Sequence, residues 1–401
     1  MRILITNHGL AARAGTELYV RDLALGLAKR GHDVVCFAPV LGQIADEIAA
    51  SGITTVDDLN GIIEPPDIIH AHHHTSAVLA YTAYPDVPAL QFCHGVLPWQ
   101  EAPLAKFANI RRYVAVDHAC RDFLIEGHAI APDTISVVLN GVDLARFTES
   151  RSPAGNETRR SRALLLSNIA DPASISPFQR ACHRAGMTLD IAGSRFNKVM
   201  DCPEAELANY GIVFAKARAA LEAMASGCAV FLADYGKAGG LVTQDRFDDL
   251  RPYNFGLRTL TEPPQTDTIE AELSAIDWHD AAQVTRRVRS EASFDALLDE
   301  LLALYQGALT APSLHDVPHE TAMSDYLHTI LPMLTERDEL AGRLYSTVNS
   351  GLGRDREMAA TIVSLLRDGG AQTRRKLAQE AVALDPDNGE ARDLLDRLKF
   401  N

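Results

Sequence analysis

Two cations lie at the start of a predicted helix, where they could bind a diphosphate group. Lys216 and Arg218 follow a predicted strand that ends at Phe214, and the helix is expected over Ala217–Ala225. The first N–H groups of a helix have no partner within the helix and attract anions. Two cationic side chains beside such amides suit a diphosphate. A solvated basic turn is the alternative interpretation.

Histidines make up a second group of chemically capable residues. His94 directly follows a predicted strand over Ala89–Cys93, so we expect it at the carboxyl end of a strand, where α/β sheets bind ligands. A structural, hydrogen-bonded histidine is the alternative. Four more histidines come at the end of another predicted strand: His70, His72, His73 and His74. No carboxylate or cysteine accompanies them nearby, so we expect His72 and His73 to line a cleft or contact an acceptor rather than bind a metal.

Small residues mark two further strand ends. Gly15 and Thr16 lie between the first predicted strand and helix, where a small residue lets a ligand approach the backbone. A plain tight turn is the alternative there. A second close-approach loop is predicted after the strand over Cys228–Ala233, with ordinary turn glycines as the alternative. Its members are Gly236, Gly239 and Gly240.

A parallel sheet is needed to position the residues of the first half. Short apolar runs without alternation predict strands covered on both faces. They are Arg2–Thr6, Asp33–Ala38, Asp67–Ala71, Ala89–Cys93, Arg112–Val116 and Ile135–Leu139. Between the first two, Thr16–Arg30 is amphipathic, with Thr16 as a possible helix cap and Gly31 as a helix end. Repeated strand–helix–strand units of this kind predict a doubly wound sheet.

A second α/β series begins after the polar segment Thr148–Arg162, which we interpret as a linker. Helices are expected over Ser174–Ala185 and Ala217–Ala225, and a longer helical pattern runs over Thr268–Tyr305. The predicted strands are Ala163–Ser167, Met187–Ala192, Gly211–Phe214 and Cys228–Ala233. The sequence therefore predicts two α/β domains, 1–150 and 151–310.

Residues 311–401 predict a helical extension without strands. The expected helices are Ser324–Val348, Arg356–Arg367, Thr373–Leu384 and Gly389–Leu398. Leu377–Leu398 resembles one helix-to-helix junction of a tetratricopeptide repeat, although one partial copy cannot bury its own face. A generic extension, suited to homo-oligomer formation, is the alternative.

Composition excludes several classes of protein. The chain is 47% hydrophobic and 23% charged, as expected of a globular α/β protein. Its net charge of -15 argues against a nucleic-acid partner, and no apolar run approaches the roughly 18 residues of a membrane span. The apolar run after Met1 is too short for a signal peptide, so we expect a cytoplasmic location. The six cysteines lack paired spacing and are expected to be buried.

Several segments, taken in order, resemble glycosyltransferase family 4, a group of retaining enzymes with the GT-B fold. They are Ala14–Leu18, Arg30–Val34, Ile68–His72, Cys93–Gly95, Asn140–Asp143 and Leu221–Gly227. The resemblance covers roughly residues 1–300. It implies two Rossmann-like α/β domains facing a cleft: an acceptor-side domain over 1–150 and a nucleotide-sugar domain over 151–310, followed by the helical extension.

The resemblance also implies roles for individual residues. His94 would contact the donor sugar near the reacting centre and is the candidate catalytic residue. Glu222 matches the second of two family glutamates, which binds the nucleotide ribose; Phe214 stands eight positions earlier, where the first is expected. The family's basic pair has no clear match after Ala163–Ser167, and Lys216 and Arg218 offer a physical substitute. The remaining donor-side candidates are Gly15, Gly239 and Gly240, and on the acceptor side Thr16 joins the histidines.

The reaction implied by this resemblance is metal-independent transfer with retention. The acceptor hydroxyl attacks from the face of the leaving group, and the departing phosphate takes its proton. No cofactor is expected beyond the nucleotide-sugar co-substrate, with a UDP-sugar slightly favoured. The acceptor would be a glycan, lipid-linked sugar, protein or small molecule.

Two rival functions are considered. A catalytically silent glycosyltransferase-like scaffold that binds nucleotide or glycan is favoured by Phe214. A Rossmann dehydrogenase is disfavoured because the first loop lacks the G-x-G-x-x-G pattern.

Overall fold

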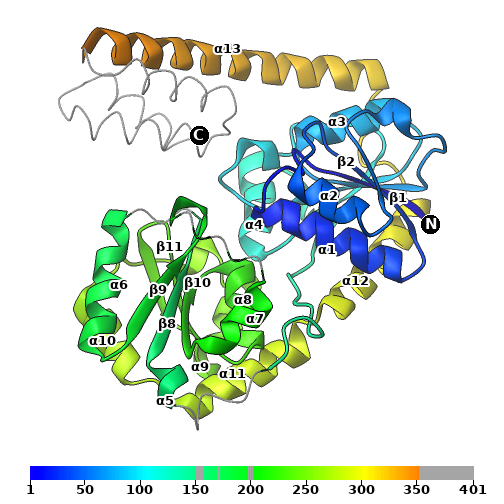
Figure 1. Ribbon diagram of the computed structural model, residues 1–401. Helices are drawn as coiled ribbons and strands as arrows, with labels where there is room; N and C mark the ends of the chain where they lie inside the picture. The colour runs from blue at the N-terminus through cyan, green and yellow to red at the C-terminus, as the bar shows by residue number, and fades with distance from the viewer. Residues whose placement is uncertain (150–156, 169–171, 197, 199, 201, 352–401) are drawn as a thin grey trace. The chain divides into compact units, whose positions relative to one another are not determined.

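The computed structural model describes residues 1–149, 157–168, 172–196, 198, 200 and 202–351. The chain forms two compact units, coloured mainly blue to cyan and green to yellow in Figure 1. The first unit comprises Met1–Val114, Asp122–Ser136 and the chain from Tyr305 on; the second comprises Ala115–Arg121 and Val137–Leu304.

A seven-stranded sheet in the order β3-β2-β1-β4-β5-β6-β7 forms the core of the first unit. The strands are β1 (Arg2–Thr6), β2 (Asp33–Phe37), β3 (Thr54–Val56), β4 (Ile68–Ala71), β5 (Ala89–Cys93), β6 (Ile110–Ala115) and β7 (Ile135–Val137). Strand β1 pairs in parallel with β2 and β4, and β4 does so with β5. Ile3, Leu4 and Ile5 are fully buried, which confirms that these runs are covered on both faces. The three-residue β3 was not predicted, because it is too short to show a pattern.

The helices around this sheet include one long amphipathic element that follows β1. The helices of the first unit are α1 (Gly15–Lys29), α2 (Gln43–Ala49), α3 (His74–Ala83) and α13 (His319–Gly351). Helices α4 (His118–Asp122) and α12 (Phe294–Thr310) each contribute residues to both units. Gly31 ends α1 as predicted: its φ is +83°, and its N–H donates to the Ala28 carbonyl at 2.9 Å. The prediction that Thr16 caps α1 is wrong. Ala14 is the N-cap, and the Thr16 hydroxyl donates to Glu17 instead.

The second unit contains a five-stranded sheet in the order β12-β11-β10-β8-β9. Its strands are β8 (Arg162–Leu166), β9 (Thr188–Ala192), β10 (Ile212–Ala215), β11 (Ala229–Asp234) and β12 (Lys237–Leu241). Its helices are α5 (Glu157–Arg160), α6 (Pro172–Arg184), α7 (Pro203–Glu206), α8 (Ala217–Ala225), α9 (Gln244–Leu250), α10 (Thr266–Ser274) and α11 (Trp278–Glu291). Strand β10 pairs in parallel with β11 and β8, and β8 does so with β9, whereas β11 and β12 are antiparallel.

Helices pack on both faces of this second sheet (Figure 1). Phe178 of α6 and Leu273 of α10 share one buried cluster, whereas Leu221 of α8 and Val288 of α11 belong to another. The helical pattern over Thr268–Tyr305 forms not one element but parts of three, α10, α11 and α12, because the chain breaks near Ala275 and Ala292.

The first part of the extension packs on the first unit. The Leu314 N–H donates to the Ile110 carbonyl at 3.0 Å, and Tyr326 of α13 bonds to His74 at 2.8 Å. Helix α13 contains the predicted helix over Ser324–Val348. The three later helices and the tetratricopeptide-like segment fall outside the described residues. Among the helices described, none is both long enough and apolar enough to cross a membrane.

Gly141, in the second unit, gives the fold a direct test. A Cβ there would lie 2.8 Å from the Ser293 carbonyl oxygen and 2.9 Å from the Phe294 Cα, both of them backbone atoms. We expect Gly141→Ala to destabilise the protein by about 1–3 kcal/mol, because the backbone must shift to make room. The control is Gly307→Ala in α12, where a Cβ meets nothing within 4 Å and where alanine should stabilise by roughly 0.5–1 kcal/mol. Calorimetric melting compares the two, and equal shifts would contradict this packing.

Candidate functional site

Histidine rings gather at the carboxyl ends of β4 and β5 in the first unit. The rings of His70 and His72 stack with centroids 4.6 Å apart, and the ring of His72 stacks on that of His94 at 4.4 Å. Phe92 covers His70 at 3.7 Å, while Tyr19 meets the edge of His94 at 4.6 Å. The structure therefore brings together His72 and His94, which the sequence had placed on different strand ends.

Strand β4 does not continue through the histidines, so alternation does not set their directions. It ends at Ala71, and α3 begins at His74 after His73, whose φ of +53° lies in the left-handed region. Such a backbone costs about 1–3 kcal/mol outside glycine, so the surroundings must hold His73 in place. His74 turns away to bond Tyr326.

Most of these imidazoles have a ring nitrogen without a hydrogen-bond partner in the described structure. His70 uses Nδ1 to bond the Tyr305 hydroxyl at 2.5 Å, but its Nε2 is buried without a partner. Both nitrogens of His72 are buried and unpartnered, as is Nε2 of His94. Buried polar atoms are normally satisfied by protein, water or a ligand. Sugar hydroxyls, which both donate and accept, would match neutral imidazoles.

Burial keeps these histidines neutral. It lowers the pKa of both His74 and His94 to about 4 and holds the pKa of His70 and His72 well below the usual value. The edge therefore presents uncharged hydrogen-bonding rings near pH 7 rather than cations.

A buried glutamate that the sequence had not singled out completes this edge. Glu101 accepts a hydrogen bond from the His94 backbone N–H at 2.8 Å, and its second carboxylate oxygen lies 3.3 Å from Nε2 of His73. In the sequence, the only feature that marks Glu101 is its position two residues after the apolar run Leu97–Trp99. His73 is thus held within the protein, and its predicted place on a cleft wall stays a prediction.

The β1–α1 junction is small but does not require glycine. A Cβ on Gly15 would meet nothing within 4 Å, so the site has room at this position. Thr16 lies in the first helical turn and bonds Glu17 at 3.0 Å. Burial raises the pKa of Glu17, only partly offset by its hydrogen bonds.

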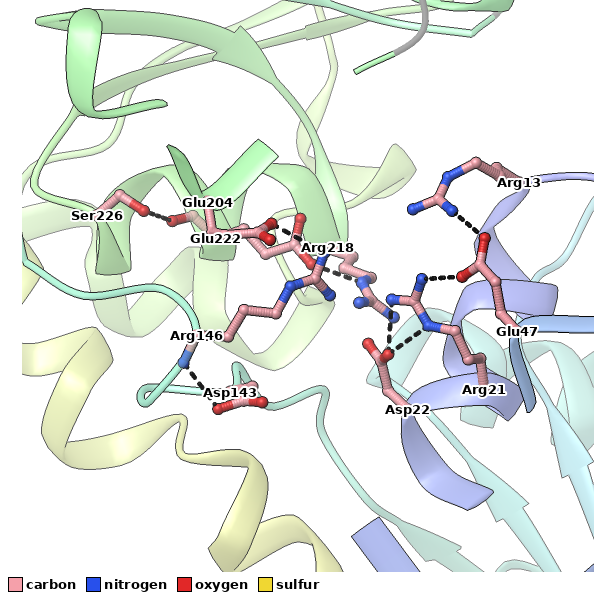
Figure 2. A network of polar contacts seen from close by, with 10 residues as sticks. All are labelled: Arg13, Arg21, Asp22, Glu47, Asp143, Arg146, Glu204, Arg218, Glu222 and Ser226. Carbon is pink, nitrogen blue, oxygen red and sulfur yellow. Dashed lines mark hydrogen bonds and ion pairs between the residues drawn. The ribbon is translucent and has the colours of Figure 1, made fainter. Parts of the chain in front are cut away.

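In the second unit, two of the predicted nucleotide residues, Arg218 and Glu222, lie together on α8 (Figure 2). Lys216 is the N-cap residue of α8, and its Nζ lies 3.4 Å from an Asp234 carboxylate oxygen. Arg218 donates to Glu222 at 2.7 Å one turn along the helix. Asp234, at the end of β11, also accepts from the Ser167 hydroxyl at 2.6 Å. An anion that binds here must therefore share or displace internal ion pairs.

Figure 2 also shows polar contacts within the first unit. Arg21 lies 2.7 Å from Asp22 and 2.8 Å from Glu47, and Arg13 bonds the same glutamate. These contacts join α1 to α2, and both arginines and Asp22 are mostly buried. They support the scaffold around Gly15.

Phe214 does not occupy a ligand-facing position. It is fully buried in β10, with its ring 5.1 Å from Phe178 and 5.4 Å from Phe231. Strand β10 ends at Ala215 and α8 begins at Ala217, so only Lys216 connects them. The residue eight positions before Glu222 is therefore part of the core.

The predicted glycine loop after β11 is wrong for two of its three members. Gly239 and Gly240 lie in strand β12, paired with β11. A Cβ on Gly239 would lie 2.4 Å from the Thr259 carbonyl oxygen, and one on Gly240 would lie 2.8 Å from Arg246. Their small size serves internal packing, because neighbouring groups already fill the space. A donor role for either glycine stays a prediction, and only Gly236 lies in the turn.

Other expectations concerned metals and thiols. Among the described residues, no group of three or more His, Cys, Asp or Glu side chains could hold a metal ion. Five cysteines are buried as expected, but Cys202 is exposed because it lies just before the short helix α7. All six thiols are free.

The sequence profile of Glycosyltransferase Family 4 matches residues 13–146. This span begins at the end of the β1–α1 connection and contains the histidines at the carboxyl ends of β4 and β5. The protein is a glycosyltransferase, and its residues 13–146 are similar to family 4. No curated protein matches the sequence.

Solved structures show that this glycosyltransferase has the GT-B fold. A glycosyltransferase from Rickettsia africae ESF-5 is similar, with a TM-score of 0.56 and 14% identity over 77% of this chain and 98% of that one. Anabaena HepE in complex with UDP and glucose is similar with a TM-score of 0.55 and 14% identity, over 77% of this chain and 100% of that one. Sucrose-phosphate synthase from Thermosynechococcus elongatus is similar with a TM-score of 0.54 and 13% identity, over 76% of this chain and 98% of that one.

The neutral histidines of this glycosyltransferase predict a loss of stability in acid. In the unfolded chain His74 and His94 take up protons near pH 6.5, whereas in the folded state they do so only near 4. As the pH falls through this window, the free energy of unfolding should decrease by about 1.4 kcal/mol per pH unit for each histidine. Urea unfolding at several pH values between 7.5 and 4.5 measures this slope.

Single substitutions separate this effect from general acid sensitivity. His74→Phe should reduce the slope, while His279→Gln, at an exposed site in the second unit, should leave it unchanged. A slope that stays the same in His74→Phe would contradict the assignment.

Proposed function

We propose that this glycosyltransferase transfers a sugar from a nucleotide-sugar, with a UDP-sugar favoured, and retains the anomeric configuration. The observation that carries the proposal is His94: a neutral imidazole with an unpartnered, buried Nε2 at the carboxyl end of β5, within the span that matches the family. A structural relative, Anabaena HepE, was crystallised with UDP and glucose, which supports the choice of donor.

The donor nucleotide would bind the second unit at the start of α8. Lys216 and Arg218 would contact the diphosphate together with the first amides of the helix, and Glu222 would accept hydrogen bonds from the ribose hydroxyls. Arg218 and Glu222 are already bonded to each other at 2.7 Å. This pairing orients both side chains before the ligand arrives, so less side-chain entropy is lost on binding.

The reaction needs no general base from the protein. The acceptor hydroxyl would attack from the side of the leaving group, and the departing phosphate would take its proton. A neutral His94 would donate or accept a hydrogen bond at the donor sugar without adding charge. The acceptor would approach the first unit near Thr16 and the histidines at the carboxyl ends of β4 and β5.

Nucleotide preference and the role of Glu222 can be measured together. Thermal stabilisation by UDP, GDP, ADP and their sugars should show one preferred nucleotide, because a ligand at 100 times its dissociation constant adds about 2.7 kcal/mol. Glu222→Ala should weaken that ligand without lowering the melting temperature of the free protein by more than a few degrees. Transfer is then assayed with the preferred sugar in the presence of EDTA. Stabilisation without any transfer would instead favour a silent nucleotide-binding scaffold.

Lys216 and Arg218 should matter for phosphates and not for the nucleoside. Lys216→Ala or Arg218→Ala should weaken a nucleoside diphosphate by roughly 1.5–3 kcal/mol, about ten- to a hundredfold, and the nucleoside little. Arg218→Lys keeps the charge but loses the planar fork, so it should also weaken binding. Calorimetric titration gives these affinities. Equal losses for nucleoside and diphosphate, or none, would remove the phosphate role.

A further inference from the structure

Glu101 is a buried charge that the proposed reaction does not use. Only 2% of its side chain is exposed, and it lies in the short helical turn η2 (Trp99–Glu101) after β5. A buried carboxylate is costly unless hydrogen bonds compensate it. Its position between two histidines therefore calls for a physical reason.

The carboxylate joins the two histidines at the strand ends. One oxygen accepts the His94 backbone N–H at 2.8 Å, and the other lies 3.3 Å from His73 Nε2. The His8 backbone N–H donates to His73 Nδ1 at 3.1 Å. Because Nδ1 accepts, the proton of a neutral His73 ring lies on Nε2 and points to Glu101.

These bonds keep Glu101 ionised. Burial alone would favour its protonated form, but the bonds from His73 and the proximity of His94 hold the pKa of Glu101 below its usual value. An ionised acceptor makes each of these hydrogen bonds stronger than a neutral one would. The direction of the His94 backbone is thus set by a charged anchor.

The anchor is in turn supported by helix α13. The ring of Trp99, two residues before Glu101, meets that of His74 with centroids 4.6 Å apart. His74 Nδ1 bonds the hydroxyl of Tyr326 on α13 at 2.8 Å, and Tyr326 is only 5% exposed. Contacts thus run without a break from α13 through His74 and Trp99 to the turn that holds Glu101.

We propose that Glu101 is the positioning residue for His94 and that helix α13 holds Glu101 in place, so the helical extension is part of the active-site support. The catalytic consequence rests on the proposed function, because it requires His94 to act on the donor sugar. Glutamine at position 101 would keep the size but lose the charge, and its amide group would face one of the two N–H donors. Tyr326→Phe would remove only the hydroxyl that fixes His74.

The test measures the His94 amide directly and the reaction separately. In Glu101→Gln, hydrogen exchange of the His94 amide should quicken and kcat should fall, each by about tenfold or more, while affinity for UDP alone stays within about twofold. Tyr326→Phe should change exchange and kcat in the same direction by about two- to tenfold. Matched controls are Glu126→Gln, exposed in the same unit, and Tyr84→Phe, whose hydroxyl bonds the Leu59 carbonyl.

Each outcome decides the proposal. Unchanged His94 exchange in Glu101→Gln overturns it, as does unchanged kcat or a parallel loss of UDP binding, since the last would indicate general damage. If Glu101→Gln does not fold, Tyr326→Phe decides, and wild-type exchange and kcat in that variant overturn the proposal. If the wild-type protein transfers no sugar from any donor, the proposed function has failed. The exchange measurement alone then decides whether Glu101 positions His94.

Discussion

The constraint on which the site depends is that several histidines must remain uncharged inside the first unit. The stacked rings of His70, His72 and His94 lie at the ends of two neighbouring parallel strands, where water is largely excluded. A proton on any of them would be a charge held away from water. The arrangement therefore favours hydrogen bonding to neutral hydroxyl groups and disfavours binding of an anion by charge at this edge.

The second unit handles charge differently. Its cations are already balanced: Lys216 lies by Asp234, and Arg218 is bonded to Glu222. Because only one residue connects β10 to α8, Lys216 and Arg218 lie directly at the carboxyl end of β10. A diphosphate would replace carboxylates as the partner of these cations, and that exchange makes binding specific for a multiply charged ligand. Under the proposed function, the neutral imidazoles of the first unit would contact the sugar, and the ion pairs of the second unit would exchange with the phosphates.

Much of the fold could be predicted because its signals are local. Unalternating apolar runs located β1 and β5 to the residue, and Gly31 marked the end of α1. The antiparallel β12 could not be found, since its Lys237–Leu241 run contains two glycines that are small for packing reasons visible only in three dimensions. Phe214 was matched to the first family glutamate because it lies eight positions before Glu222. The short β10–α8 connection instead places Phe214 in the core.

The candidate site was only partly predictable. His94 and Glu222 were found through motifs, but Glu101 and Tyr326 carry no motif, and the contacts of Tyr326 span 252 residues of sequence. Long-range contacts of this kind depend on how the helices pack, which no local pattern encodes.

The proposed function requires a neutral His94 to contact the sugar of the donor. The most direct measurement is nitrogen NMR of the protein labelled with ¹⁵N-histidine, titrated with the preferred nucleotide and with its sugar conjugate between pH 5.5 and 8. We expect a neutral His94 ring throughout, whose Nε2 signal shifts with the nucleotide-sugar but not with the nucleotide alone. A His94 ring that is protonated at pH 6, or that responds equally to both ligands, would contradict it.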